Sequence, residues 1–354
     1  MRLCLRRQVF AGSSTSLHST MEPANPADRR VLSLVAIAYV YMACLMFGRA
    51  SPSFAVPATS PSTPTSDQPL ADIVVAANAG NAAAQLELAR RYDVGQDVPK
   101  DFSAAFQWAF KAARQGSAEA ERDIGVCYMQ GRGTTKDQTE GIKWLRLSAA
   151  GGDRTAMVEL GIAYELGNGV LKSGPEAVRW YRKAADMGSP RGQYDLGRAY
   201  LNGVGITQDF QQAAYWLQKA AAQNDPAAQF AIGDLYRLGK GVSKDDQEAL
   251  KWIQKSAQQG FLFAELGLAH MYWQGDGVHR DLAQAAHWAA ASADQGSDAG
   301  ELLLAEMYES GLGMKQNSAE ALTWYRKAAA QNNADAVAAV ARLERLAMTP
   351  STRQ

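Results

Sequence analysis

The tryptophans of this sequence recur with a period of 36 residues. Seven of the eight keep that spacing, a tyrosine stands 16 residues before each of them, and a glycine follows three residues after each tyrosine. The three columns are Trp108, Trp144, Trp180, Trp216, Trp252, Trp288 and Trp324; Tyr92, Tyr128, Tyr164, Tyr200, Tyr236, Tyr272 and Tyr308; and Gly95, Gly131, Gly167, Gly203, Gly239, Gly275 and Gly311. A constant period of this length indicates an array of similar small units that stack on one another.

Each unit contains the start and stop signals of two helices. In the unit from Asp225 to Gly260, Asp225 can cap a first helix that ends at Gly239, and Asp245 can cap a second helix that ends at Gly260. The cap column of the second helix is Asp101, Asp137, Ser173, Asp209, Asp245, Asp281 and Asn317, and the column that ends it is Gly80, Gly116, Gly152, Gly188, Asn224, Gly260, Gly296 and Asn332. The pattern therefore predicts an all-α fold.

A unit of 36 residues is too small to bury its apolar face alone. We therefore expect a right-handed α/α superhelical solenoid of seven 36-residue helix-turn-helix repeats, in which the Trp and Tyr columns lie in the core. An eighth unit begins at Asn333 without the Gly loop, the Tyr or the Trp, which predicts a C-terminal capping helix. We call the two helices of each repeat helix A and helix B.

The full repeat pattern resembles that of the Sel-one-like repeat family, a branch of the tetratricopeptide-like (TPR-like) solenoids. The resemblance covers roughly residues 80–345 and is fullest in the fifth repeat, at Ala228, Gly233, Tyr236, Ala249 and Lys255 among others. It is interrupted at Asp97, Gly141, Leu147 and Ala291. The resemblance implies a non-catalytic adaptor or scaffold for protein–protein interaction, often exported or membrane-tethered. It does not identify the partner, which is an unidentified protein or peptide.

Residues 31–48 form an uncharged, apolar run directly behind Arg29 and Arg30. As a helix this run would span roughly 27 Å at about 1.5 Å per residue, which is close to the thickness of the bilayer's hydrocarbon core. It fits a membrane anchor or a cleaved signal peptide, and a core helix of a cytosolic protein is the third interpretation. Because basic residues stay on the cytoplasmic side, we expect the chain after Gly48 to be exported, either membrane-anchored or periplasmic or secreted after cleavage.

Composition divides the chain into five parts. They are a basic leader (1–30), the transmembrane or signal segment (31–48), a Ser/Thr/Pro-rich linker (49–70), the repeat solenoid (71–346) and a tail (347–354). Translation can start at Met1 or at Met21. The membrane is a partner only if the N-terminal segment stays uncleaved.

Charge and chemistry give little support to other classes of function. The 36 basic residues balance 36 acidic ones, which does not suit a nucleic-acid binder. Four histidines, none in a metal-ligand spacing, argue against a metal site or a cofactor, and the packed position of Cys127 predicts an inert thiol. The chain is therefore not expected to be an enzyme. The alternative is a β-lactamase-like hydrolase of envelope peptides or glycans, although the cysteine framework of such family members is missing.

Partner binding is expected on the concave surface of the A helices in the fourth to sixth repeats, at positions that break the repeat. These are Tyr194, Arg198, Phe230, Arg237, Phe263, His270 and Trp273. Trp273 stands outside the tryptophan period, and its column otherwise holds Asp93, Met129, Glu165, Leu201, Arg237 and Glu309, a variation that argues against a packing role. Aromatic and Arg side chains are common interface anchors. The alternative is that Tyr194, Phe230 and Phe263 pack between adjacent A helices.

Overall fold

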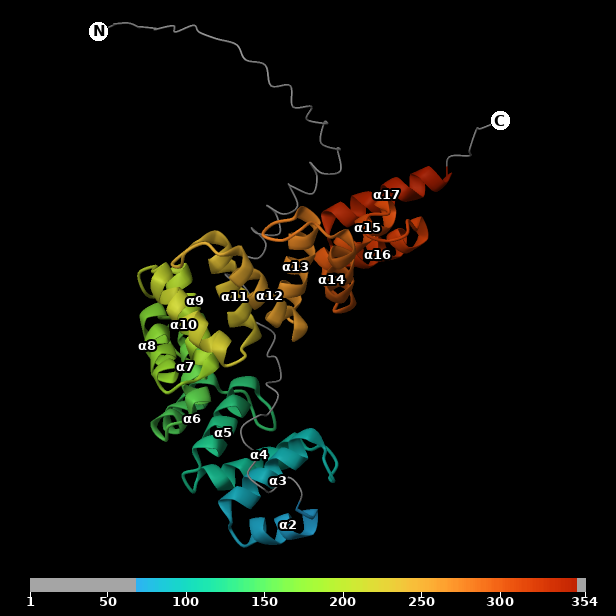
Figure 1. Ribbon diagram of the computed structural model, residues 1–354. Coiled ribbons are helices and arrows are strands. Elements are labelled where there is room, and N and C mark those ends of the chain that lie inside the picture. Colours follow the sequence, from blue (N-terminus) through green and yellow to red (C-terminus); the bar gives the residue numbers. More distant parts are fainter. Residues whose placement is uncertain (1–67, 349–354) are drawn as a thin grey trace, which may run out of the picture. The chain divides into compact units, whose positions relative to one another are not determined.

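The structure, a computed structural model, describes residues 68–348 (Figure 1). The basic leader, the apolar run 31–48, nearly all of the linker and the last six residues lie outside the described residues. Between 68 and 348 the chain forms sixteen α-helices and no strand, which confirms the all-α prediction. The strongest helix–helix contacts are all between helices that follow one another in sequence, as in a solenoid.

The helices alternate between the two types predicted from the repeat. The A helices are α3 (Ala82–Val94), α5 (Ala118–Gln130), α7 (Arg154–Leu166), α9 (Pro190–Asn202), α11 (Pro226–Leu238), α13 (Leu262–Gln274) and α15 (Asp298–Ser310). The B helices are α4 (Phe102–Ala113), α6 (Gln138–Ala150), α8 (Gly174–Asp186), α10 (Phe210–Ala222), α12 (Asp246–Gln258), α14 (Leu282–Asp294) and α16 (Ser318–Ala330). A B-type helix, α2 (Leu70–Asn78), precedes the first repeat, and an A-type helix, α17 (Ala334–Met348), follows the seventh.

The predicted caps all form. Each of the seven residues in the B-helix cap column accepts a hydrogen bond from a backbone N–H in the first turn, as Asp245 does from Gln247 and Glu248 at 3.0 Å. Every residue of the column that ends helix B has a positive φ, including Asn224 and Asn332. The start and stop of each helix are therefore specified by local sequence, and tertiary packing supplies the rest.

The second glycine of the A–B loop brings each repeat close to the one before it. Gly241 has a φ of 72°, and a Cβ there would overlap the backbone carbonyl group of Phe210, the first residue of α10. In the first repeat Asp97 takes this place with a φ of 59°, and its carboxylate bonds the buried Arg91 at 2.8 Å. The G-x-G loops thus serve packing, as expected for a feature that recurs in nearly every repeat.

Helices A and B of one repeat meet where a small residue faces a large one. A Cβ added at Gly233 of α11 would lie 2.6 Å from the Ile253 side chain of α12. The same pairing recurs as Gly125 with Leu145, Gly161 with Tyr181, and Gly197 with Leu217. In the first and sixth repeats both positions hold alanine, as Ala89 with Ala109 and Ala269 with Ala289, and all four are buried. Each side chain therefore fits the space that its partner leaves.

The Trp column is less buried than predicted. Trp216 is 7% exposed, whereas the other six rings are half-buried. In five repeats a lysine three residues later places its ammonium group 3.5–5.1 Å from the centre of the ring. Those lysines, which stand in the last turn of their B helices, therefore cover the Trp rings through cation–π contacts. The lysine is replaced by Leu147 and Ala291 in the second and sixth repeats.

The fit between Gly233 and Ile253 makes a testable exchange. Gly233→Ala forces a methyl group against Ile253, and Ile253→Ala leaves a cavity, so each single change should lower the free energy of unfolding, by about 2–5 kcal/mol for the cavity. The double variant reproduces the Ala–Ala pair of two natural repeats and should lose less than the sum of the single losses. Chemical denaturation of the four proteins measures the coupling. Additive losses would show that the two positions do not share one space.

Trp216 and Trp324 provide a test of position in the array. Trp216 is buried between repeats in the middle of the array, so Trp216→Ala should cost about 3–5 kcal/mol of unfolding free energy. Trp324→Ala in the last repeat removes a half-buried ring with fewer neighbours and should cost clearly less. Denaturant titrations of both variants decide the matter, and equal small losses would mean that neither ring supports the core.

Candidate partner-binding surface

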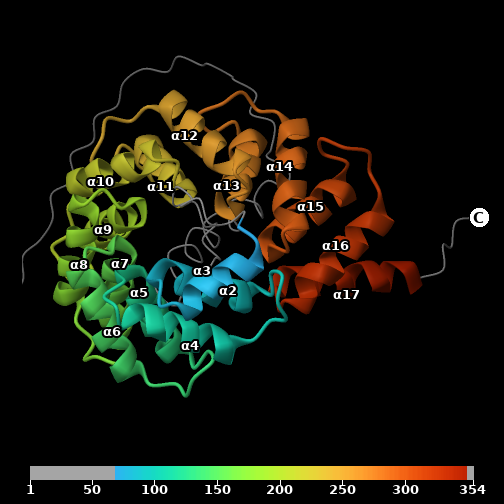
Figure 2. The same cartoon turned by 90° about the horizontal axis from the view of Figure 1, so that it is seen from below.

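The A helices line the inner side of the repeat array and the B helices its outer side (Figure 2). The seven residues predicted to bind a partner lie on the three A helices α9, α11 and α13. The structure divides them into two groups. Tyr194 and Arg198 belong to a charged cluster on α9, and the others surround an aromatic cluster on α11 and α13.

Arg198 ties two repeats together. Its Nη2 donates to Oε2 of Glu165 on α7 at 2.6 Å, and its Nε lies 3.6 Å from Oδ1 of the buried Asp195. The Tyr181 hydroxyl donates to the same Glu165 oxygen at 2.6 Å. Burial opposes ionisation of Glu165, but the hydrogen bonds from Arg198 and Tyr181 hold its pKa below the usual value. Arg198 is therefore already engaged within the fold.

Tyr194 is half-buried beside the same cluster, with the Arg191 guanidinium 5.9 Å from its ring centre. Burial raises the pKa of its hydroxyl to about 12, so the side chain stays neutral. The packing alternative considered for this residue agrees with that environment, because the ring lies against neighbouring side chains more than in solvent.

Arg237 and Trp273 are more buried than a groove position requires. Arg237 bonds Asp234 at 2.8 Å and Asp276 of the next repeat at 3.1 Å, and 14% of its side chain is exposed. Trp273 is 5% exposed. The argument that a varied column cannot be a packing column is therefore wrong for Trp273. The column varies because each member meets a different neighbour.

An aromatic cluster joins α11 to the start of α13. The rings of Phe230 and Phe261 are 5.9 Å apart, and those of Phe261 and Phe263 meet edge to face at 5.5 Å. Phe230 is 8% exposed because its ring lies on the backbone of Gly267, where a Cβ would be 3.2 Å from the ring. Phe261, Phe263 and Gly267 keep part of their surface exposed. We call these four residues with His270 the aromatic surface.

His270 is the polar member of the aromatic surface. Its Nδ1 is buried and has no hydrogen-bond partner among the described residues. Burial lowers the pKa of the imidazole to about 4, so His270 is neutral near pH 7. The aromatic surface therefore has no positive charge from this residue.

One column of the A helices changes chemistry along the array. It holds an acid in the first four repeats and small or apolar residues in the last three: Glu87, Asp123, Glu159 and Asp195, then Ala231, Gly267 and Leu303. Glu87, Asp123 and Asp195 pair with arginines of their own helices. Along this column the A helices carry an acid on α3–α9, paired with an arginine on α3, α5 and α9, and carry no charge on α11–α15.

Phe261 was missed by the sequence analysis, although its position carries a signal. The residue before each A helix accepts a hydrogen bond from the first turn at Asn81, Ser117, Asp153, Ser189, Asp225, Ser297 and Asn333. Phe261 stands at the same point before α13 and makes no side-chain cap bond. Reading the A-helix cap column as closely as the B-helix column would have singled it out.

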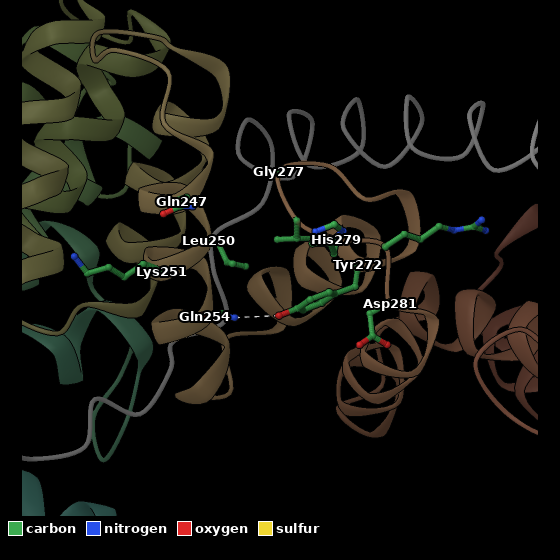
Figure 3. A pocket seen from close by; sticks show the side chains of 10 residues that line it. Gln247, Leu250, Lys251, Gln254, Tyr272, Gly277, His279 and Asp281 are labelled. Atoms are coloured by element: carbon green, nitrogen blue, oxygen red, sulfur yellow. Dashed lines mark hydrogen bonds between the residues drawn. The ribbon is translucent and has the colours of Figure 1, made fainter.

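A pocket of about 580 Å³ lies on the other side of the sixth repeat, between α12 and the loop before α14 (Figure 3). Tyr272 contributes to its wall and accepts a hydrogen bond from Gln254 at 3.1 Å. The carboxylate of Asp281 caps α14, and the Lys251 side chain extends away from His279 and Tyr272. The polar groups of this pocket are thus largely committed to the fold.

The described residues contain no group of three or more His, Cys, Asp or Glu side chains able to hold a metal ion. Burial raises the pKa of the half-buried Cys127 to about 11, so its thiol is protonated near neutral pH, as an inert cysteine would be. Within residues 68–348, no helix has the length and apolar character needed to cross a bilayer.

Comparisons with known proteins agree on the repeat. The family model of the Sel1 repeat matches residues 82–117, 118–153, 155–189, 190–225, 226–261, 262–297 and 299–333. The chain is 37% identical to the crystal structure of a protective antigen of uropathogenic Escherichia coli with an SLR fold, at a TM-score of 0.68, over 78% of this chain and 59% of that one. It is 31% identical to a Sel1 repeat protein from Oxalobacter formigenes, at a TM-score of 0.66. That match covers 77% of this chain and 79% of the Oxalobacter chain. The chain thus spans less than two thirds of the E. coli protein's structure. The search of curated proteins gave no match.

Proposed function

The chain belongs to the Sel1 repeat family, and from that premise we propose that it is a non-catalytic scaffold that binds a partner protein through the aromatic surface of α11 and α13. Sel1 repeat proteins are generally protein-interaction scaffolds. The aromatic surface combines three of the five residues that break the repeat on α11 and α13, Phe230, Phe263 and His270, with a local departure from the capping rule at Phe261.

The observation that carries the proposal is Phe261. An N-cap acceptor stabilises a helix by about 1 kcal/mol, and α13 lacks it while the equivalent A helices have it. A residue that breaks a local rule without a local gain often marks a functional position. Phe261 instead adds a partly exposed ring between Phe230 and Phe263. Clustered aromatic rings are the side chains that most often anchor protein interfaces.

The chemistry of the surface favours an apolar anchor on the partner. His270 is neutral, the acidic column is replaced by Ala231 and Gly267, and Arg237 is paired with two aspartates. An acidic or basic partner side chain would be desolvated there without compensation. Phe261 and Phe263 are the partly exposed rings, and the buried Phe230 packs against Phe261.

Site-specific cross-linking can identify the partner. A photoreactive benzoylphenylalanine in place of Phe263 should cross-link the partner in cells, since position 263 is partly exposed on the aromatic surface. The matched control is the same residue in place of Tyr215, which is 49% exposed on the outer helix α10. A partner captured from position 215 and not from position 263 would move the interface to the outer side.

Affinity for the captured partner then tests the residue itself. Phe263→Ala removes a half-buried anchor ring and should weaken binding by about 2 kcal/mol, roughly 30-fold in Kd, with little effect on folding. Tyr215→Ala should leave Kd unchanged. Calorimetric titration measures both. Trp273→Ala is not suitable for this purpose, because the ring is buried and its loss would destabilise the fold. Equal Kd values for Phe263→Ala and the unmodified protein would exclude the aromatic surface.

We also propose that the repeats function outside the cytoplasm. The support is in the sequence: an uncharged apolar run at 31–48 follows Arg29 and Arg30, an arrangement that keeps the basic end inside. That run lies outside the described residues.

Export can be measured with reporter fusions at Asp67, at the end of the linker. A reporter that is active only after export should be active, and one that is active only in the cytoplasm should be silent. The mass of the mature chain then separates a retained anchor from a cleaved signal. Activity of the cytoplasmic reporter alone would contradict export.

A further inference from the structure

A buried side-chain amide joins three consecutive helices in several repeats. Gln229 of α11 donates its Nε2 to the backbone carbonyl of Ala221 on α10 at 3.2 Å, and its Oε1 accepts from Nε2 of Gln259, at the end of α12, at 2.7 Å. The same arrangement occurs in the first and fourth repeats, with Gln85, Ala77 and Gln115, and with Gln193, Ala185 and Gln223. We call this arrangement the glutamine clamp.

The clamp satisfies both ends of an amide that has almost no access to water. Gln85, Gln193 and Gln229 are 5%, 5% and 1% exposed. The amide N–H reaches back to the preceding B helix, and the amide oxygen reaches forward to the B helix of its own repeat. A buried polar group satisfied in this way stabilises the joint, whereas an unsatisfied one would weaken it.

The sixth and seventh repeats place a carboxyl group where the clamp has an amide. Glu265 and Glu301, 4% and 5% exposed, accept hydrogen bonds from Gln295 and Gln331 at 2.7 and 2.9 Å. The forward half of the clamp is therefore kept. An ionised carboxylate has no hydrogen to donate, so it cannot make the backward bond to the carbonyl eight residues earlier, at Ala257 or Ala293.

The neighbours of each carboxyl group are few. His287 of α14 is the ionisable group whose interaction with Glu265 lowers the pKa of that carboxyl. Lys327 of α16 lowers the pKa of Glu301, and Asp298 of α15 raises it. Burial is the largest effect on both groups and raises the pKa of each above the usual value for glutamate. The surroundings thus favour the protonated form.

We propose that Glu265 and Glu301 are proton-controlled joints of the array. When protonated, each carboxyl group donates to the carbonyl of Ala257 or Ala293 and completes the clamp as glutamine does. When ionised, it loses that bond and places a negative oxygen beside the carbonyl. The two joints hold α12–α16, so acidification tightens the part of the array that contains α13.

The direction in which pH changes the stability of the fold follows from proton linkage. A carboxyl group whose folded-state pKa is raised stabilises the fold below its unfolded pKa, and this contribution is lost as pH rises through the folded pKa. A glutamine at the same position is insensitive to pH. The stability difference between a Gln variant and the unmodified protein should therefore grow from acid to neutral pH.

The decisive proteins are the double variant E265Q/E301Q and the reverse variant Q229E. Glutamine occurs naturally at this position in three repeats, so E265Q/E301Q should fold. Its melting temperature should exceed that of the unmodified chain by about 2–4 °C at pH 7.5 and match it near pH 4.5. Q229E should show the opposite, with a loss at pH 7.5 that shrinks in acid. A constant difference across this range, or a less stable double variant at pH 7.5, would overturn the proposal.

Hydrogen exchange locates the effect. At pH 7.5 the amides of α13 and α15 should exchange more slowly in E265Q/E301Q than in the unmodified chain, while those of α5, in the second repeat, should be unchanged. Comparison at one pH removes the intrinsic pH dependence of exchange. Identical exchange of α13 and α15 in the two proteins would contradict proton-controlled joints there.

Discussion

The close approach of the two helices within each repeat is the contact on which the array depends. At this contact the residue after the tryptophan faces a glycine or an alanine of helix A in every repeat, and the seventh repeat pairs Ala305 with Tyr325. Gly161 leaves room for the whole ring of Tyr181, Gly233 for Ile253, and the alanine pairs divide the space equally. Because interiors are packed to crystal-like density, the helix A position stays small whatever residue it faces. The geometry of the A–B pair then sets the positions of the loops, the glutamine clamps and the inner surface in each repeat.

The contacts between repeats are more varied than those within them. Ion pairs such as Arg198 with Glu165 and Arg237 with Asp276, amide clamps, and rings such as Phe230 over Gly267 join neighbouring repeats, each at only some positions of the array. This freedom lets the inner side differ from one end to the other. Three of the four column acids on α3–α9 pair with arginines, whereas the α11–α13 stretch leaves Phe261 and Phe263 partly exposed. A repeat scaffold can thus keep the same fold throughout and carry its binding residues on only a few of its repeats.

Much of this structure could be predicted from the sequence because its determinants are local. Caps such as Asp245 and turns such as Gly239 depend on a few adjacent residues, and the 36-residue period repeats them. The site was predictable only in part, because the exposure of Trp273 or Arg237 depends on side chains about a repeat away. The contacts of the lysines with the Trp rings were not predictable for a related reason, because a lysine at a helix end is also compatible with solvation alone. The missing cap at Phe261 can be recognised in the sequence. Its ring contacts with Phe230 and Phe263 cannot, because they depend on how α11 packs against α13.

The most direct test of the account compares two glycines that both lie within A helices. Gly161→Ala would place a methyl group inside the ring of Tyr181 at the A–B contact, whereas Gly267→Ala would meet only the edge of Phe230 at 3.2 Å. Alanine gains about 1 kcal/mol of helix propensity over glycine at either site. The account predicts that Gly161→Ala lowers the free energy of unfolding by more than that gain, while Gly267→Ala leaves it nearly unchanged. A Gly161→Ala protein as stable as the unmodified chain in denaturant titration would contradict the claim that this contact sets the fold.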